Sequence, residues 1–258
     1  MQQSESHKPY KGEKMFKIYD IHSHILPGVD DGAETMERSM EMLEAALAEG
    51  IRGIILTPHY HGGHYEAAAG YVSRIFKSLC EQAKEKYPEI RLYLGNEIYY
   101  YPSVPEWLQE GRVHAMSESS YVLLEFAPGV RLREIREAVQ HMTGAGYYPI
   151  LAHAERYQSL VEKAEQAELL IQMGAYIQVN AETINGETGI KSRHFVKKLM
   201  KKEQVHFVAS DAHSLGRRGP YLRKSAEYLC KHYGEEYTIR LLQENPEKLI
   251  SNTYIGGE

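Results

Sequence analysis

Residues 20–32 read DIHSHILPGVDDG and continue the short apolar run FKIYDI, residues 16–21. A β-strand alternates its faces with period two, so His22 and His24 are expected to point the same way. Two imidazoles on one strand face rarely serve packing, although a hydrogen-bonded pair of core histidines is the alternative. They suit a metal ion, and the carboxylates that follow suit it too. The stretch therefore predicts a strand that ends at a metal site.

Short apolar runs typical of buried strands recur along the chain, each followed by a helical pattern. Seven such runs are found, at 17–22, 52–57, 91–95, 121–126, 147–153, 175–180 and 205–210. Amphipathic segments between them predict helices at 34–49, 71–87, 131–143, 159–173, 191–203, 219–232 and 235–243. Strands that alternate with helices indicate a parallel sheet, and without a Gly- or Pro-rich linker they indicate one barrel-like α/β domain.

The composition is that of a globular protein and argues against several classes. The chain has 258 residues, 43% of them hydrophobic and 25% charged, which allows a sizeable core. Its net charge of −5, from 30 basic and 35 acidic residues, argues against general nucleic-acid binding, which needs a basic face. No apolar run approaches the roughly 18 residues of a membrane span.

The first residues have no apolar segment of the kind found in a secretory signal. Residues 1–16 are therefore predicted to be a flexible N-terminal extension, with Met15 as an alternative start, before a single domain at 17–258. Cys80 and Cys230 lie far apart in helix-like segments, so a disulfide framework is not expected and the reducing cytoplasm is the predicted location. Neither begins a Cys-x5-Arg loop, since Lys86 and Glu236 stand six residues on. This disfavours a phosphatase with a cysteine nucleophile.

Polar residues stand at the ends of the predicted strands. In chain order they are His22 with His24, His59, Glu97, Glu125, His153 with Arg156, Asn180, and Asp211 with His213. The carboxyl ends of all strands of a (β/α) barrel face one mouth, where active sites are built. Residues spread over most of the chain are therefore expected to converge there.

Histidines and carboxylates without a thiolate suit Mn²⁺, Zn²⁺ or Fe²⁺ better than a structural zinc site. The candidate ligands are His22, His24, Asp31, His59, Glu97, Glu125, His153, Asp211 and His213. They are too many for one ion, so two or three ions are expected. Closely spaced metal ions are the usual device for phosphoester hydrolysis.

The motifs HSH, TPH and SDAHS at three strand ends resemble the PHP (polymerase and histidinol phosphatase) superfamily. A larger set of motifs over roughly residues 20–249, which adds EIYY, LLEF, HAERY and QVN, more closely resembles the bacterial manganese-dependent protein-tyrosine phosphatases of capsular and exopolysaccharide loci. The resemblance implies a single distorted (β/α)7 barrel of the PHP type. It also implies hydrolysis of phosphotyrosine on a protein, in particular a bacterial tyrosine autokinase.

The resemblance further implies three metal sites, with manganese as the expected ion and iron or zinc as alternatives. The first site is His22, His24, Glu97 and Asp211; the second is Glu97, Glu125 and His153, with Glu97 bridging; the third is Asp31, His59 and His213. The family also uses arginines for the phosphate. Arg156 matches one of them, and Arg217 or Arg218 matches the other, with Arg218 favoured.

Other roles stay open for some of these residues. Asp31 could be a turn residue or the N-cap of the helix that follows, although Asp30 is the better candidate for a cap. Glu125 could pair with a buried arginine, and Arg156 could pair with a barrel carboxylate. Both arginine candidates in the SLGRRGP loop, residues 214–220, could be solvated charges.

Two other functions are retained as alternatives. One is a small-molecule phosphatase of the histidinol-phosphate kind, with the same chemistry and a narrower pocket. The other is a non-catalytic partner of the kinase that keeps only the fold, against which the complete ligand set argues. His61 and His64 in a Gly-rich loop beside the mouth are interpreted as mobile loop residues, with substrate contact as the alternative. The oligomeric state is left open.

Overall fold

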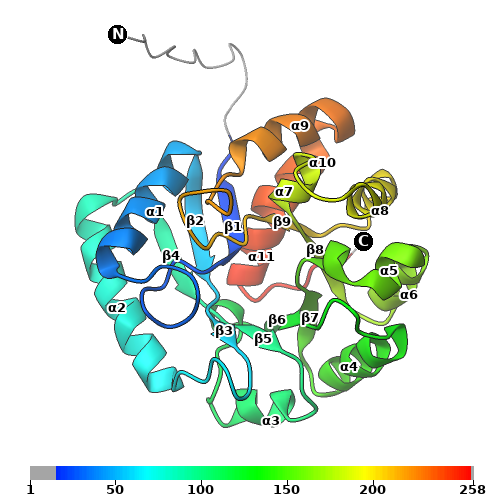
Figure 1. Ribbon diagram of the computed structural model, residues 1–258, viewed down its shortest axis with the longest axis horizontal. Helices are drawn as coiled ribbons and strands as arrows, with labels where there is room; N and C mark the ends of the chain where they lie inside the picture. The colour runs from blue at the N-terminus through cyan, green and yellow to red at the C-terminus, as the bar shows by residue number, and fades with distance from the viewer. Residues whose placement is uncertain (1–15, 257–258) are drawn as a thin grey trace.

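Parallel strands form a curled sheet at the centre of the molecule, and helices surround it. In Figure 1 the chain passes round this centre from blue through green and yellow to orange. The computed structural model describes residues 16–256. Residues 1–15, which hold nearly all of the predicted extension and the alternative start at Met15, lie outside the described residues. Phe16 packs against the core.

The elements follow one another mainly as strand and then helix. The strands are β1 (Ile18–Ser23), β2 (Ile51–Leu56), β3 (His59–Tyr60), β4 (Arg91–Leu94), β5 (Glu97–Tyr99), β6 (Tyr121–Glu125), β7 (Tyr148–Leu151), β8 (Tyr176–Asn180) and β9 (Phe207–Ala209). The α-helices are α1 (Met36–Ala48), α2 (Ala69–Lys86), α3 (Val104–Gln109), α4 (Leu132–Gly144), α5 (Gln158–Glu162), α6 (Gln166–Gln172), α7 (Ala181–Ile184), α8 (Ile190–Lys201), α9 (Arg223–Tyr233), α10 (Glu235–Ile239) and α11 (Asn245–Ile250). Short helical turns are η1 (Met116–Glu118), η2 (Ala154–Arg156) and η3 (Arg240–Glu244).

The named strands pair in parallel in two hydrogen-bonded parts. One part has the order β1-β2-β4 and the other the order β3-β5-β6-β7-β8-β9. All seven predicted strands are present, which confirms a curled parallel α/β sheet. The count of seven is not confirmed, because β3 and β5 follow β2 and β4 after short breaks and bring the number in residues 16–256 to nine.

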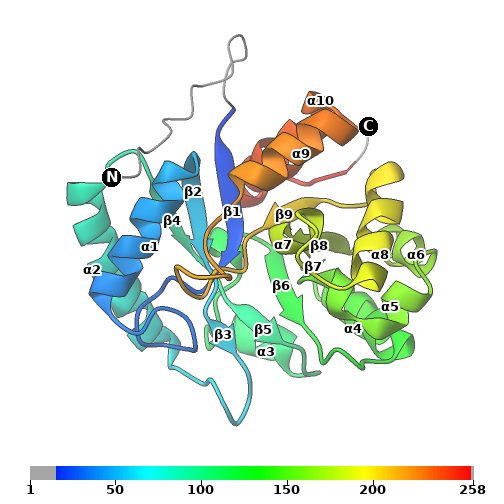
Figure 2. The ribbon, with the colours of Figure 1, turned by 45° about the horizontal axis from the view of Figure 1, so that its top comes forward.

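The last strand returns to the first, and Figure 2 shows β1 between β2 and β9. The backbone N–H of Asp211, just past β9, donates to the carbonyl of His22 in β1 at 2.9 Å. The buried carboxylate of Asp20 accepts hydrogen bonds from the N–H and the hydroxyl of Ser210. These bonds tie the first strand to the segment that follows the last strand, at the edge of the sheet where the predicted ligands lie.

Two apolar clusters fix the sheet, one inside its curl and one between it and the helices. Strand β6 shows how alternation feeds both, since Leu123 belongs to the inner cluster and Val122 and Leu124 to the outer one. Burying each such side chain stabilises the fold by about 1.5–3 kcal/mol. The inner cluster closes at the amino ends of the strands, where the hydroxyl of Tyr121 donates to the carbonyl of Thr253 at 2.9 Å. The inner apolar side chains thus fill the amino end of the curl, and the polar side chains of the site lie at the carboxyl ends of the strands.

The start of α1 corrects one prediction. The helix is capped by Thr35, whose hydroxyl accepts a hydrogen bond from the N–H of Arg38 at 3.2 Å. Asp30 and Asp31 are therefore not helix caps. The helix ends at Ala48, close to the predicted end at residue 49, and Gly50 just beyond it adopts φ +89°.

Several predicted helix boundaries are wrong. The single helix expected at 159–173 is two helices, α5 and α6, because Lys163 leaves the helical region with φ −131° and ψ 62°. The helix expected at 219–232 begins only at Arg223. The short helices α3, α7 and α11 were not predicted, since so few turns give too little periodicity.

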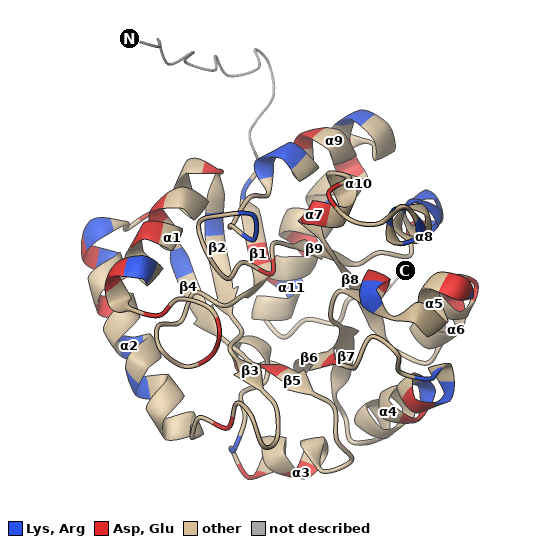
Figure 3. Ribbon diagram, in the orientation of Figure 1, with Lys and Arg blue, Asp and Glu red and all other residues tan. Residues whose placement is uncertain are grey.

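Acidic and basic residues are mixed along α1, α4 and α9, as Figure 3 shows. These helices therefore present no surface of a single charge. Among the residues that the structure describes, no helix is long and apolar enough to cross a membrane.

Candidate metal centre

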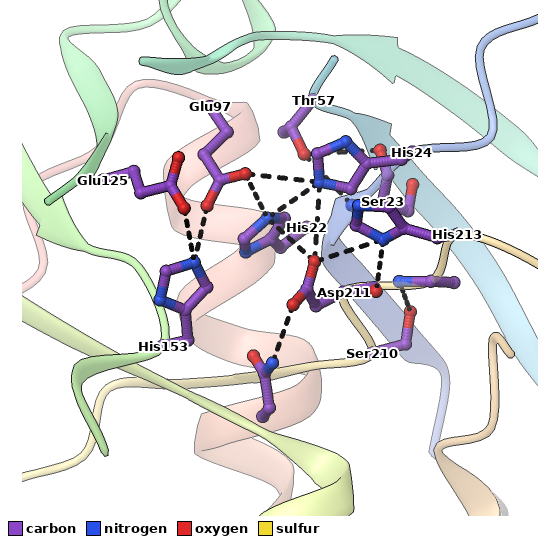
Figure 4. A network of polar contacts seen from close by, with 12 residues as sticks. His22, Ser23, His24, Thr57, Glu97, Glu125, His153, Ser210, Asp211 and His213 are labelled. Carbon is purple, nitrogen blue, oxygen red and sulfur yellow. Dashed lines mark hydrogen bonds and ion pairs between the residues drawn. The ribbon is translucent and has the colours of Figure 1, made fainter. Parts of the chain in front are cut away.

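The nine candidate ligands come together at the carboxyl ends of the strands. Each has a side-chain nitrogen or oxygen within 3.6 Å of another member of the set. Figure 4 shows most of them pointing toward one another from different elements. They come from β1, β3, β5 and β6 and from the segments that follow β1, β7 and β9. The predicted convergence is present in the structure.

His22, His24, Glu97 and Asp211 form the buried floor of the centre, each with an exposed fraction of no more than 2%. The Nε2 atoms of His22 and His24 are 3.3 Å apart. Each lies 3.2–3.3 Å from Oε2 of Glu97 and 3.5 Å from Oδ1 of Asp211. Ligand atoms about 2.1 Å from one shared ion are separated by roughly such distances.

Irregular backbone directs three of these side chains. Near its end β1 carries one more residue than its partner β2. A bulge of this kind re-aims a side chain, and it brings His22 into the centre directly after Ile21 of the inner core. His153 and Asp211 have φ values of +32° and +54°. Residues other than glycine seldom adopt this left-handed region, and such strain is found mainly at functional sites.

Glu97 lies between two histidines. Its Oε1 is 2.8 Å from Nε2 of His153, and its Oε2 is 2.9 Å from Nδ1 of His59. Glu125 lies 3.6 Å from both histidines. The buried Oε2 of Glu97 lies near three imidazole nitrogens, but none of these contacts has the geometry of a hydrogen bond. The central position of this carboxylate is what a bridging ligand requires.

Asp31 forms the open side of the centre. Its Oδ1 is 3.4 Å from Nε2 of both His59 and His213, and it is 47% exposed. His24 completes this group, whose four ligand atoms lie within 4.8 Å of one another. The side chain thus faces the histidines and does not cap a helix.

The proximity of these groups shifts their pKa values strongly. Burial alone would raise the pKa of the Glu97 carboxyl, but the charge of His22 and a hydrogen bond from His153 hold it well below its usual range. Burial likewise opposes ionisation of Asp211, and His22, His24 and Arg156 together hold its pKa well below normal. Burial and the negative charge of Glu97 raise the pKa of Glu125 to about 7.

Asp30 is a functional residue that the sequence did not reveal. Its Oδ2 lies 2.7 Å from Nδ1 of His24 and accepts the backbone N–H of His59 at 2.9 Å. Its Oδ1 accepts the N–H of Gly32 at 3.0 Å. A carboxylate on the far nitrogen of a histidine fixes the tautomer and the ring orientation, and so presents Nε2 to a metal. A His-x-His motif followed by a second acidic residue is the signal that could have found it.

A second supporting network lies under the floor. The side-chain carbonyl of Gln178 accepts the N–H of His153 at 2.7 Å and lies 3.2 Å from Nδ1 of His22. Its side-chain amide donates to Oδ1 of Asn180 at 2.8 Å, and the side-chain amide of Asn180 donates to Oδ2 of Asp211 at 2.9 Å. Three candidate ligands are thereby oriented from β8. Only Asn180 stood out in the sequence.

The predicted arginines separate into two that reach the centre and one that does not. Arg156 donates to Oδ2 of Asp211 at 2.6 Å, and Arg218 donates to Oδ1 at 3.1 Å. Arg217 instead donates to the backbone carbonyl of Glu187 at 3.1 Å. Arg156 therefore pairs with a carboxylate, as the alternative interpretation expected, and it also lies beside the centre.

The two cysteines lie on α2 and α9, away from the strand ends. Burial, with a contribution from the charge of Glu81, raises the pKa of the Cys80 thiol to about 11. A thiol with so high a pKa is a poor nucleophile at neutral pH.

The residues present fit bound divalent ions. Histidine nitrogens and carboxylate oxygens converge without a thiolate, and two imidazole Nε2 atoms face each other at 3.3 Å. The buried Oε2 of Glu97 lacks a hydrogen bond, and a buried polar atom of this kind calls for a partner. An ion in the floor would supply that partner.

Comparison with known proteins agrees with this geometry. Residues 18–251 match the model of a family described as capsular polysaccharide synthesis, CpsB/CapC. The chain is 31% identical over 243 residues to the tyrosine-protein phosphatase CpsB of Streptococcus agalactiae serotype III (strain NEM316), which covers 92% of this chain and 100% of that protein. It is 32% identical over 238 residues to the tyrosine-protein phosphatase YwqE of Bacillus subtilis (strain 168), which covers 92% of this chain and 93% of that protein.

Solved structures give the same result. A chain from the crystal structures of YwqE from Bacillus subtilis and CpsB from Streptococcus pneumoniae, described as unique metal-dependent tyrosine phosphatases, superposes with a TM-score of 0.86 at 31% identity. The match covers 93% of this chain and 96% of that one. The phosphotriesterase homology protein from Escherichia coli superposes with a TM-score of 0.59 at 12% identity, over 91% of this chain and 99% of that one. At that identity the likeness shows the fold alone.

Proposed function

The chain belongs to the CpsB/CapC family of capsular polysaccharide synthesis proteins, and from this premise we propose that it is a metal-dependent tyrosine-protein phosphatase. The observation that carries the proposal is the convergence of nine histidine and carboxylate side chains at one edge of the sheet, with two arginines beside them. Histidine and carboxylate ligands in this number suit a multinuclear centre for phosphoester hydrolysis.

The proposed ligand sets follow the three clusters. His22, His24, Glu97 and Asp211 would hold the first ion; Glu97 and Glu125, with His153 or His59, the second; and Asp31, His59 and His213 the third. The mixed nitrogen and oxygen donors favour manganese, with iron or zinc as alternatives. Asp30 and Gln178 would orient the histidines from behind.

Divalent ions bound there would polarise the phosphoryl group and make water a better nucleophile at neutral pH. The chain's own contribution is to orient the ester. Arg156 and Arg218 are 35% and 39% exposed and border the open side of the centre. A guanidinium presents a planar fork that matches two phosphoryl oxygens, so these side chains would hold the phosphate in line for attack. The leaving phenolate, with an unperturbed pKa of about 10, needs less help from an acid than an alkoxide does.

A polar cavity lies beside the centre and could take the residues that flank a phosphotyrosine. Its volume is about 370 Å³, and it extends from Asp211 and Arg218 over α7 and the start of α9. Charged side chains of both signs line it, among them Glu187 and Lys224. Such a cavity offers room and polar partners for the residues that flank a phosphotyrosine.

We propose a bacterial tyrosine autokinase of the capsular or exopolysaccharide system as the protein substrate. The family's role in capsular polysaccharide synthesis supports this choice. The cytoplasm is the proposed place of the reaction, since a chain with two cysteines suits a reducing compartment.

We also propose that the two sheets together form one distorted seven-stranded barrel, in which β2 with β3 and β4 with β5 are each one interrupted strand. The breaks between β2 and β3 and between β4 and β5 span only two residues each. An isolated parallel bridge between Ser23 and Ala212 supports closure between the first and last strands.

The decisive experiment compares a phosphotyrosyl peptide with histidinol phosphate, in EDTA and with added Mn²⁺. The expected result is hydrolysis of the peptide that EDTA abolishes, that Mn²⁺ restores, and that alkylation of the thiols leaves intact. Preference for histidinol phosphate would support the small-molecule alternative. Activity that survives EDTA and is lost on alkylation would overturn the metal mechanism.

A further inference from the structure

Three aromatic side chains border the metal centre without taking part in it. They are His61, Tyr99 and Tyr101, here called the aromatic rim. His61 stacks on Tyr99 with ring centroids 4.1 Å apart and an interplanar angle of 9°. Tyr99 and Tyr101 follow at 5.5 Å and 50°. All three are half-buried, so part of each ring remains accessible.

Strand register places the rim directly outward of the ligands. Strand β3 pairs with β5 so that His59 lies beside Glu97. Because side chains alternate along a strand, His61 and Tyr99 share the face of these two ligands, two residues farther on, a rise of roughly 6–7 Å. Tyr99 in turn lies beside Glu125 in β6. The rim is therefore the next layer of side chains from the floor toward solvent.

The rim is held in place from both sides. His61 heads a tight turn through Gly62 and Gly63, in which its N–H donates to the carbonyl of Tyr65 at 2.9 Å. The ring of Tyr65 stacks on that of His59, with centroids 5.5 Å apart and an interplanar angle of 17°. The turn is thus anchored to a candidate ligand.

Tyr101 is supported from behind. Its ring packs on Trp107 at 5.7 Å, and Trp107 packs edge-on against the buried Tyr60 at 5.4 Å. Tyr60 belongs to the outer core. The rim is thus packed against neighbouring side chains on both of its sides.

We propose that the aromatic rim binds the aryl ring of the substrate and selects aryl over alkyl phosphate esters. The inference rests on the proposed function, since a phosphoryl group held at the ligand layer carries its ester oxygen outward. The ring of a phosphotyrosine then reaches the layer of His61 and Tyr99. Aromatic rings in offset or edge-on contact attract one another beyond the area they bury. A serine or threonine ester has no ring to offer.

Direct binding of phenylphosphonate and of methylphosphonate, measured by isothermal titration calorimetry, tests the inference, because neither compound is hydrolysed. The metal-loaded wild-type protein is expected to bind phenylphosphonate about 10-fold more tightly than methylphosphonate, as one or two ring contacts provide. His61→Ala and Tyr99→Leu should each reduce this ratio roughly 3- to 10-fold and leave the dissociation constant of methylphosphonate unchanged. Tyr99→Phe, which keeps the ring, should retain the ratio.

Tyr100→Leu is the matched control. Tyr100 lies between the two rim tyrosines in the chain, but its hydroxyl contacts His141 and its ring packs on Phe126, so its loss should leave the ratio intact. Metal content reports folding; if Tyr99→Leu loses its metal, His61→Ala in the turn decides. A wild-type ratio near one, or a ratio retained in both variants, overturns the inference. Failure of the wild type to hydrolyse a phosphotyrosyl peptide would overturn the proposed function alone, because the two phosphonate dissociation constants are measured by direct binding without any turnover.

Discussion

Replacing Asp30 by asparagine should weaken metal binding although Asp30 is not itself a proposed ligand. The carboxylate contacts Nδ1 of His24 at 2.7 Å and the N–H groups of His59 and Gly32 at 2.9 and 3.0 Å. Asparagine keeps the shape and can retain the bonds to the backbone, but it removes the negative charge beside His24. The hydrogen bond that orients Nε2 toward the floor then loses its charge assistance.

The expected loss is 10- to 100-fold in affinity for Mn²⁺, which corresponds to about 1.4–2.7 kcal/mol. This agrees with the roughly 1.5–3 kcal/mol that a hydrogen bond to a charged group contributes. At saturating Mn²⁺ the variant should recover most of its kcat/KM, because the arginines proposed to bind phosphate are untouched. Competition with a chelator measures the affinity, and metal-dependent hydrolysis of a phosphotyrosyl peptide measures the activity.

Thr35→Ala is the matched control for this variant. Thr35 caps α1 a few residues after Asp30, and its loss should lower the free energy of unfolding by about 0.5–2 kcal/mol without changing metal affinity. If Asp30→Asn lowers only the melting temperature, as the cap variant does, and leaves the affinity unchanged, Asp30 merely fastens its loop. The assigned role in orienting His24 would then be wrong.

Three further outcomes are expected. Arg156→Lys should lower kcat/KM by roughly 10²–10³ with unchanged metal content, whereas Arg217→Lys, a change of the same charge type outside the centre, should leave it within a few-fold; unchanged kinetics with a lower melting temperature would make Arg156 a structural ion pair. Gly32→Ala should cost both stability and metal binding, since a Cβ there would lie 2.0 Å from the carbonyl oxygen of His24, while Gly129→Ala meets nothing within 4 Å and should preserve both. Burial disfavours protonation of His24, yet Asp30 and the other carboxylates hold its pKa well above normal in the metal-free protein. The stability from these ion pairs is full below about pH 6.5 and is lost as the pH rises through the raised pKa of His24. A metal ion must displace the proton from His24, so the rise in melting temperature with Mn²⁺ should be larger at about pH 8 than at about pH 6. An equal rise at both pH values would contradict this prediction.

The strands and the candidate ligands at their ends could be predicted because each depends on local sequence. An apolar run followed by a histidine or a carboxylate places that residue at a strand end wherever the strand lies in the sheet. The parallel topology then brings the ends together. For this reason His59 and Glu97, far apart in the sequence, could be assigned to one site.

The remaining features depend on contacts between distant segments. The left-handed backbone of His153 and Asp211 is stabilised by neighbours such as Gln178 and the carbonyl of His22. Neither residue type announces this conformation in the sequence. The short strand β5 exists because Tyr99 finds a partner in β6. The role of Asp30 likewise could be assigned only from the structure, because it depends on where the His24 ring lies.

Asp211 would link the proposed metal site to the proposed phosphate site through a single side chain. Its two oxygens receive Arg156 and Asn180 on one side and Arg218 on the other, and Oδ1 also faces the two floor histidines at 3.5 Å. A carboxylate shared in this way sets the distance between the metal floor and both guanidinium groups. Its negative charge also offsets two cations that would otherwise repel an incoming ion. Since a bound ion would draw on the same oxygens, it would loosen the arginines from Asp211 and leave their forks available to a phosphoryl group.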